Sequence, residues 1–452
     1  MFMKVAPHVL GLWIVFIAFT FEGNSILVPP IPSVGAPWHG HAIRARSECL
    51  AQAFWVLENN VAAAIFPPSP TGAIFAICGL NYTAWSAEAY ALPASDASLS
   101  RLASLGANYV ALLVTGYMED HSSTEIYLDP HLTPSDRALG HAIRVAHSLG
   151  LKVMLKPHVD LRSGGWRGHI TPRDPLIWFQ RYADFILRYA RLAQDYNVEL
   201  FCVGTELRSL STAKFRLYWK EVILTVRRSF RGGLVYAANW DEYPFVDFWD
   251  LLDYAGIDAY FPLSSSRTPT VTELIEAWKP WIAALEGWQA EVGKPVIFTE
   301  IGYRSVDYAA REPWNWTARA PYNPEAQANC FEAVFLALQG KPWFAGVFFW
   351  NWLPDPNAGG AGDLDYTPQN KPAEAVLARF FQGRLSYPAM GSSSARFPDS
   401  PNELRNVHGQ QAECIRTPLR NAKGGGAGEK ARGRSTGTMR NLRDKGGAAY
   451  AG

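Results

Sequence analysis

Two glutamates, Glu206 and Glu300, each follow a short apolar run of the sequence. Cleavage of a glycosidic bond needs such a pair. One acid must protonate the leaving oxygen, while an ionised carboxylate stabilises or attacks the oxocarbenium-like carbon. A separation of about 5–5.5 Å between the two gives retention of configuration, and about 6.5–9.5 Å gives inversion. The alternative is that each glutamate pairs with a nearby arginine, Arg208 or Arg304, in a structural role.

Polar and aromatic residues stand at the ends of the other apolar runs. Their polar groups can bond to sugar hydroxyls, and their rings can stack on the C–H faces of a sugar. We expect Tyr260 to hydrogen-bond Glu300 and keep it ionised, and Trp350 to form the floor beneath the sugar at the cleavage point. The candidate substrate-binding residues are Asn81, Tyr82, Trp85, Lys156, His158, Trp166, Thr205, Asn239, Trp240, Asp258, Tyr260 and Trp350.

His158 and Asp160 stand at alternate positions and could share one face of a strand, which is the arrangement of a possible metal site. A zinc site needs at least three protein ligands, and no third one stands nearby in the sequence. We therefore expect neither a metal nor a cofactor.

The candidate residues belong to a pattern that repeats from about residue 73 to 382: a β-branched or aromatic run, a polar loop and an amphipathic helix. Each repeat is typical of a βα unit. The pattern predicts eight strands, at residues 73–79, 109–114, 152–155, 199–204, 234–238, 254–260, 295–299 and 346–350. It predicts helices at residues 94–105, 135–149, 174–197, 212–230, 270–292, 324–338 and 371–381.

Eight parallel strands that are buried on both faces close into a barrel, so the predicted fold is an α/β fold of the (β/α)8 TIM barrel type, with a single catalytic domain. A doubly wound open sheet is the alternative. It would need a glycine-rich phosphate loop after the first strand, and residues 78–83 lack one. In a barrel the C-terminal strand ends line one mouth. Strands four and seven lie across it, so Glu206 and Glu300 can converge there.

Three segments together resemble glycoside hydrolase family 113: residues 203–207 (VGTEL), 298–305 (FTEIGYRS) and 346–352 (GVFFWNW). The resemblance covers roughly residues 73–381. It implies a retaining glycosidase of clan A, active on mannan, with Glu206 as acid/base and Glu300 as nucleophile. Thr205 departs from the pattern, because many clan A enzymes carry an asparagine immediately before the acid/base, where it contacts the sugar 2-hydroxyl.

The composition excludes several classes of protein. The chain has 452 residues, 48% hydrophobic and 18% charged, which argues against wholesale disorder, a collagen-like fibre or a polytopic membrane protein. Its 42 basic and 41 acidic side chains provide no electrostatic basis for a nucleic-acid partner. The five scattered cysteines form no CxxC pair and indicate neither a disulfide framework nor a structural metal.

Both ends of the chain differ from the repeating region. Residues 1–25, with Lys4 before an apolar stretch, fit a signal peptide; without an A-x-A cleavage triplet, a signal anchor is the alternative. Either one places the protein outside the cytoplasm, secreted or membrane-anchored. Residues 26–72 are interpreted as a proline-containing extension, 73–382 as the catalytic domain, and 383–452 as a disordered, Gly-rich basic tail.

The sequence thus predicts a retaining glycoside hydrolase that acts on a β-linked polysaccharide or oligosaccharide, with β-1,4-mannan as the leading substrate. The alternative is a non-catalytic carbohydrate-binding barrel at the cell surface, and a third hypothesis is a membrane-tethered scaffold. Endo or exo action, hydrolysis or transglycosylation, and oligomeric state stay open at this stage.

Overall fold

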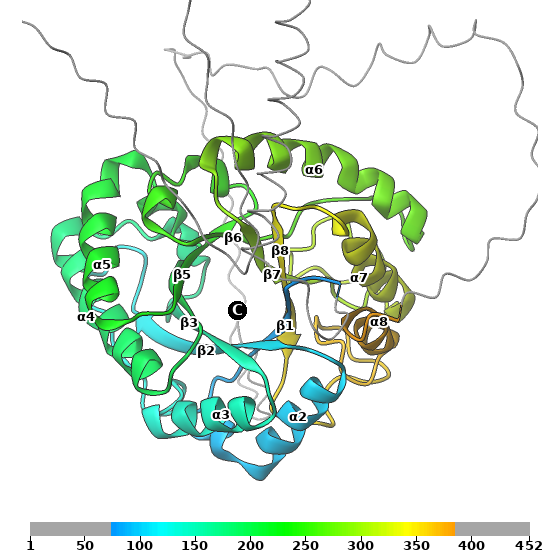
Figure 1. Ribbon diagram of the computed structural model, residues 1–452, viewed down its shortest axis with the longest axis horizontal. Helices are drawn as coiled ribbons and strands as arrows, with labels where there is room; N and C mark the ends of the chain where they lie inside the picture. Colours follow the sequence, from blue (N-terminus) through cyan, green and yellow to red (C-terminus); the bar gives the residue numbers. More distant parts are fainter. Residues whose placement is uncertain (1–73, 385–452) are drawn as a thin grey trace, which may run out of the picture. The chain divides into compact units, whose positions relative to one another are not determined.

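The computed structural model describes residues 74–384, which form a closed barrel of eight parallel strands in sequential order, surrounded by helices (Figure 1). The prediction of a (β/α)8 barrel is confirmed. The predicted N-terminal segment and extension lie outside the described residues, as does the tail beyond residue 384. The strands are β1 (Ile77–Tyr82), β2 (Tyr109–Met118), β3 (Lys152–Leu161), β4 (Leu200–Thr205), β5 (Gly233–Asn239), β6 (Tyr254–Asp258), β7 (Val296–Ile301) and β8 (Phe344–Trp352).

The helices begin at residues that suit helix starts. Ser135, Asp174, Thr270 and Asn323 each accept a hydrogen bond from a backbone N–H in the first turn of the helix that follows. The helices are α2 (Pro93–Ser104), α3 (Asp136–Ser148), α4 (Pro175–Asp195), α5 (Arg216–Ser229), α6 (Val271–Val292), α7 (Pro324–Leu338) and α8 (Pro372–Phe381). Between β5 and β6 the chain forms only the 3₁₀ turns Tyr243–Phe245 and Trp249–Leu251.

Alternating positions along the strands divide the core into two layers. One set of strand side chains packs outward against the helices, as Leu80 and Val110 do. The other set forms a separate cluster, with Met154 of β3 and Val235 of β5 among its members. Because strand side chains alternate between faces, this inner cluster fills the interior of the barrel. Positions further along the same inward face are therefore directed to the barrel's C-terminal mouth.

The first strand lies later in the chain than the predicted 73–79. The side-chain amide of Asn108 donates to the carbonyl oxygen of Ala76, and its oxygen accepts from the N–H of Cys78. The ladder with β2 then begins at the pair Gly79 and Tyr109. This shift brings Asn81 and Tyr82 into the strand, where neighbouring residues face opposite sides.

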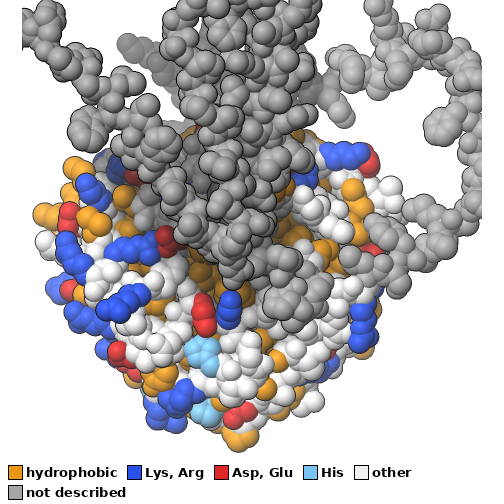
Figure 2. All heavy atoms as spheres, viewed as in Figure 1, with side chains coloured by type: hydrophobic (Ala, Val, Ile, Leu, Met, Phe, Trp, Pro, Cys, Tyr) orange, Lys and Arg blue, Asp and Glu red, His pale blue; other side chains and the backbone are white. Residues whose placement is uncertain are grey.

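The surface of the described region carries both signs of charge. In the visible part of the face in Figure 2, Lys and Arg side chains are spread around the rim, with acidic side chains between them. Within residues 74–384, no helix combines the length and the hydrophobicity that a membrane span requires.

A substitution of Gly346 in β8 tests whether closure of the barrel requires a glycine at this position. Gly346 pairs with Ile77 of β1 and Ile297 of β7, its φ is 147°, and an added Cβ would collide with the Ile77 carbonyl oxygen. Gly346→Ala should lower the free energy of unfolding by about 3 kcal/mol or more, because it combines backbone strain with overpacking. Thermal and denaturant unfolding would measure the loss.

The matched control is Gly287→Ala in α6, where an added Cβ meets nothing within 4 Å. Alanine favours the helix over glycine by about 1 kcal/mol, so this variant should be more stable than the wild type. Equal stability of the two variants would contradict this account of barrel closure.

Candidate active site

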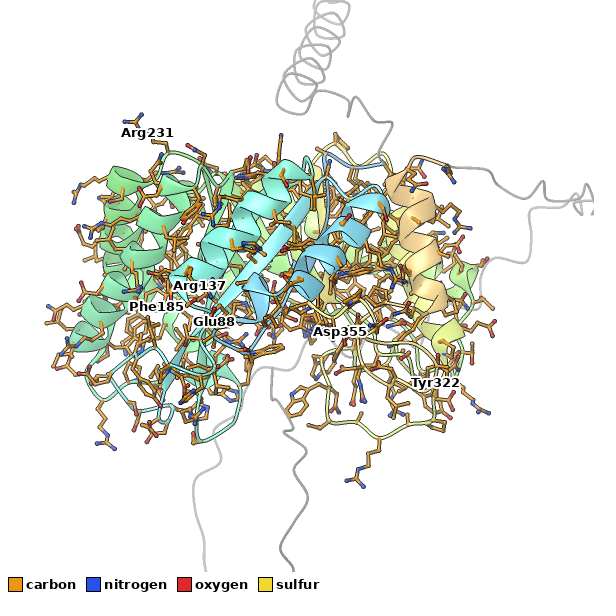
Figure 3. The ribbon with its side chains drawn as sticks, turned by 90° about the horizontal axis from the view of Figure 1, so that it is seen from below. Glu88, Arg137, Phe185, Arg231, Tyr322 and Asp355 are labelled. Carbon is orange, nitrogen blue, oxygen red and sulfur yellow. The ribbon has the colours of Figure 1, made fainter. Side chains whose placement is uncertain are left out.

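The C-terminal ends of the strands face one end of the barrel (Figure 3). Arg231, which precedes β5 and therefore marks the opposite strand ends, lies at the upper end of this view. Tyr322 and Asp355, which follow β7 and β8, lie toward the lower end. The mouth that holds the strand-end residues is therefore the lower end in Figure 3.

Glu206 leaves β4 in an unusual backbone conformation. Its φ is 51°, in the left-handed region, while its N–H donates to the carbonyl oxygen of Ala237 on β5 at 2.7 Å. Strained residues of this kind cluster at functional sites, where surrounding contacts hold them in place. The turn directs the side chain into the mouth, where Oε2 accepts hydrogen bonds from Trp166 Nε1 at 3.0 Å and Arg167 Nη1 at 3.1 Å.

Asp160 anchors the arginine that contacts Glu206. Arg167 donates through Nε, at 3.1 Å, and Nη2 to Asp160 Oδ1, at the end of β3. Burial is the largest influence on Glu206 and raises its pKa; Arg167 opposes this effect, and the negative charge of Glu300 adds to it. The pKa of Glu206 therefore lies above its ordinary value, which favours the protonated acid.

Glu300 has a different set of partners. Its Oε1 accepts a hydrogen bond from Lys156 Nζ at 2.5 Å, and its Oε2 accepts one from the Tyr260 hydroxyl at 2.8 Å. The expected contact with Tyr260 is thus present. Both carboxylate oxygens face a donor, and one donor is a cation, so this environment stabilises the negative charge of Glu300.

Lys156 joins Glu300 to a second carboxyl group that has no exposed surface. Its Nζ also donates to Asp258 Oδ1 at 3.2 Å, and Thr299 Oγ1 donates to the same oxygen at 2.7 Å. The side chains of Lys156 and Asp258 are 0% exposed. The sequence predicts both as substrate-binding residues, but neither side chain is exposed at the mouth, and Lys156 links Asp258 to Glu300.

The pKa directions of this buried pair are consistent with its role. Burial alone would lower the pKa of Lys156, but Asp258 and Glu300 outweigh it and raise the pKa above its usual value. Burial and the charge of Glu300 raise the pKa of Asp258 well above its ordinary value, although Lys156 opposes them. Lys156 therefore keeps its charge, and its ammonium group opposes the protonation of Asp258 that burial favours.

Each of the four carboxyl groups at the mouth contacts a cation. Burial and neighbouring negative charge favour the neutral form of Glu206 and Asp258. Arg167 contacts both Glu206 and Asp160, and Lys156 contacts both Glu300 and Asp258. The arrangement suits one protonated and one ionised glutamate, which is the division that glycosidic bond cleavage requires.

His158 and Trp350 lie together on the Glu300 side of the mouth. Their rings are parallel within 7° at a centroid distance of 6.3 Å, and His158 Nε2 lies 3.7 Å from Glu300 Oε1. Burial, together with the charges of Arg167 and Lys156, lowers the pKa of His158 well below its ordinary value. A neutral imidazole whose Nε2 makes no hydrogen bond within the protein is suited to bond a sugar hydroxyl.

The three candidate residues near the end of β1 lie in different parts of the fold. Asn81 points into the barrel, where Nδ2 donates to the carbonyl oxygens of Thr299 and Phe348 and Oδ1 is buried. Tyr82 lies on the opposite face, with its hydroxyl bonded to Ser95 of α2, so it packs in the helix layer and not at the mouth. Trp85 is half-buried in the loop after the strand.

The remaining predicted residues belong to β4 and to the end of β5. Thr205 is buried, and its hydroxyl lies 3.7 Å from Cys202 Sγ. The side-chain amide of Asn239 donates to Asp241 Oδ1 at 2.9 Å. Trp240 stacks on Trp314, in the loop after β7, with ring centroids 5.1 Å apart.

Sequence reasoning missed Arg167, which contacts Glu206, and Trp314, which stacks on Trp240. Arg167 directly follows the predicted Trp166 in the loop after β3, and that adjacency was the available signal. Trp314 lies in a long loop with no strand nearby to position it. Among residues 74–384, no group of three or more His, Cys, Asp or Glu side chains is arranged to hold a metal ion.

Comparison with known proteins adds independent findings. The family model described as Glycoside Hydrolase Family 113 matches residues 81–371. No curated protein sequence matches the chain. A solved β-mannanase of that family from Alicyclobacillus acidocaldarius, in complex with ManMIm, is 31% identical, with a TM-score of 0.62 over 68% of this chain and 97% of its own.

Two further solved structures of a family 113 β-1,4-mannanase, one of them a complex, are each 28% identical to this chain, with TM-scores of 0.62. Each match covers 68% of this chain, and 99% and 98% of the respective structures. The similarity therefore spans nearly the whole length of these relatives.

Arg167→Met should raise the pKa of Glu206. The substitution removes a buried cation that favours the ionised form of Glu206. The measurement is a pH titration of carboxyl ¹³C shifts in glutamate-labelled protein, with Glu206→Gln used to assign the resonance.

Arg208→Met is the matched control for this titration. Arg208 is close in sequence to Glu206, but its guanidinium pairs with Asp241 on the surface. It should leave the pKa of Glu206 unchanged. An unchanged or lowered pKa in Arg167→Met would show that Arg167 does not set the ionisation of Glu206.

Proposed function

The chain belongs to glycoside hydrolase family 113 and is a glycoside hydrolase, and from this premise we propose that it cleaves β-1,4-mannan with retention of configuration. The observation that carries the proposal is the contrast between the two glutamates. Glu300 contacts a cation and a phenol, whereas burial and neighbouring negative charge favour the protonated form of Glu206. The β-mannanase relatives support the substrate class.

In the proposed first step, Glu300 attacks the anomeric carbon while Glu206 transfers its proton to the leaving glycosidic oxygen. The bond between the anomeric carbon and that oxygen breaks, and an ester forms between the sugar and Glu300. Tyr260 and Lys156 hold the two oxygens of Glu300 before the attack. Such fixed positioning reduces the reorganisation that the transition state requires.

In the second step, Glu206 acts as a base. The charge of Glu300 contributes to the raised pKa of Glu206, so formation of the neutral ester removes that contribution and lowers the pKa. Arg167 then stabilises the ionised form. Glu206 takes a proton from water as the water oxygen bonds to the anomeric carbon, and the ester bond to Glu300 breaks.

We further propose that His158 and Trp350 bind the sugar whose bond is broken. Trp350 is partly exposed beside the buried His158, so an aromatic plate and an imidazole nitrogen lie together next to Glu300. Thr205 stands immediately before Glu206, where many clan A enzymes carry an asparagine that contacts the sugar 2-hydroxyl. The Thr205 hydroxyl is buried near Cys202, so the hydrogen bond to the sugar 2-hydroxyl must be arranged differently here.

The place of action is also a proposal. The composition of residues 1–25 supports export, and a polysaccharide substrate would be met outside the cell. Cell fractionation with an antibody against the barrel tests this location. Recovery from the medium or the membrane fraction supports export, and recovery from the cytoplasm alone contradicts it.

Variants of the two glutamates test the proposed mechanism. The wild type should release reducing ends from β-1,4-mannan in preference to cellulose and xylan. Glu206→Ala should lower the rate by about 10²–10⁴-fold, because general acid catalysis is lost. Glu300→Ala should reduce release to background, while Glu125→Gln, which alters an exposed glutamate, should retain activity.

Azide distinguishes the two roles. With an activated mannoside, azide should rescue Glu206→Ala to give the β-glycosyl azide, because the anion attacks the Glu300 ester without needing a base. It should rescue Glu300→Ala to give the α-glycosyl azide, because it attacks the sugar directly. Exchanged product configurations would reverse the roles, and sugar binding without any release by the wild type would favour a binding barrel.

A further inference from the structure

The loop between β7 and α7, residues 302–323, exposes two tryptophans. Trp314 is 40% exposed and Trp316 is 45% exposed. Flat aromatic rings suit the C–H faces of sugars. The loop follows directly from the strand that carries Glu300.

A short series of contacts places Trp314 at the edge of the catalytic mouth. The Tyr260 hydroxyl bonds Glu300, and the ring of Tyr260 meets that of Tyr366 edge-on at 6.3 Å. The Tyr366 hydroxyl donates to the carbonyl oxygen of Pro313 at 2.6 Å. Trp314 is the next residue, so two tyrosines connect it to Glu300.

Trp240 packs against Trp314. It follows β5, whereas Trp314 follows β7, so the two residues come from the strands on either side of β6. The two indoles stack at 5.1 Å with an interplanar angle of 25°. Trp240 in turn meets Phe261 at 6.1 Å and Trp281 at 6.0 Å, both in edge-on contacts. Because one face of Trp314 lies on Trp240, its exposed surface is the other face and the ring edge.

Hydrogen bonds from backbone and side-chain groups hold this loop in place. The N–H of Leu263 donates to the carbonyl oxygen of Ala310 at 2.8 Å, and the guanidinium of Arg304 donates to that of Ala318. At the far end of the loop, the Asn323 amide donates to Asp307 at 2.8 Å. Trp314, with Trp240 behind it, forms an aromatic plate whose position is already fixed. Such a plate loses little conformational freedom when a ligand binds.

The strand order assigns the plate to one side of the cleavage point. Trp240 follows β5, which pairs with β4, the strand before Glu206. Trp350 lies on β8, on the other side of β7 and Glu300. Trp240 and the proposed proton donor Glu206 thus follow neighbouring strands, whereas Trp350 lies on the strand at the other side of Glu300.

We propose that Trp314, backed by Trp240, stacks against a sugar ring on the leaving-group side of the bond that is cleaved. This inference rests on the proposed function. It makes Trp314 a determinant of chain-length preference, since only substrates with a sugar on that side can use it. The same plate binds an acceptor sugar, whose hydroxyl gives its proton to Glu206 as its oxygen replaces Glu300 at the anomeric carbon.

Two substrates separate this role from a general effect on the site. Mannohexaose places sugars on both sides of the cleaved bond, whereas β-mannobiosyl fluoride has only fluoride on the leaving-group side. Trp314→Ala should lower kcat/KM for mannohexaose about tenfold and leave that for the fluoride within about twofold. It should also lower the ratio of transfer to hydrolysis when mannotriose is the acceptor.

Two further variants complete the test. Trp314→Phe keeps an aromatic ring and should recover most of the activity on mannohexaose. Phe245→Ala removes another exposed aromatic side chain, 63% exposed and outside this series of contacts, and should leave both substrates unaffected. Thermal unfolding of each variant confirms that the barrel is intact.

Equal losses on both substrates, or no loss on either, would overturn the proposal. A loss on mannohexaose in Phe245→Ala as large as in Trp314→Ala would also overturn it. Failure of the proposed function looks different, because the wild type itself would then cleave neither mannohexaose nor the fluoride.

Discussion

The charge balance among buried groups at the barrel mouth is the constraint on which the rest of the site depends. Two glutamates share a poorly solvated space, so ionisation of one makes ionisation of the other more costly. Lys156 and Tyr260 stabilise the charge on Glu300, which favours the neutral form of Glu206. The proposed roles of the two glutamates, one as acid and one as nucleophile, thus depend on where one lysine and one arginine are placed.

The barrel makes this placement possible because its interior is filled up to the mouth. The inner cluster that includes Met154 ends just below the site, and Lys156 and His158 continue the same inward face of β3. Asp160, two residues further on, reaches Arg167 in the following loop. One strand therefore supplies groups that influence both glutamates, through Lys156 to Glu300 and through Arg167 to Glu206.

Much of this arrangement follows from the sequence, but not all of it. Glu206, Glu300 and Trp350 stand at strand ends, and a closed barrel brings strand ends together whatever the loops do. Tyr82 is predicted at the mouth but packs against α2, because the side of a strand that a residue faces changes with every position. The sequence predicts Lys156 and Asp258 as sugar ligands, because composition does not reveal that a charged pair is wholly buried. Arg167 and Trp314 depend on loop conformation, which strand periodicity does not determine.

The central claim is that Glu300 forms a covalent bond with the sugar while Glu206 transfers protons. The most direct measurement is to trap the intermediate with 2-deoxy-2-fluoro-β-mannosyl fluoride and to identify the modified residue by peptide mass spectrometry. The account predicts one added fluorosugar per chain, attached to Glu300. Attachment at Glu206 would contradict the account, as would an intact reagent with no adduct on an enzyme that is active on mannan.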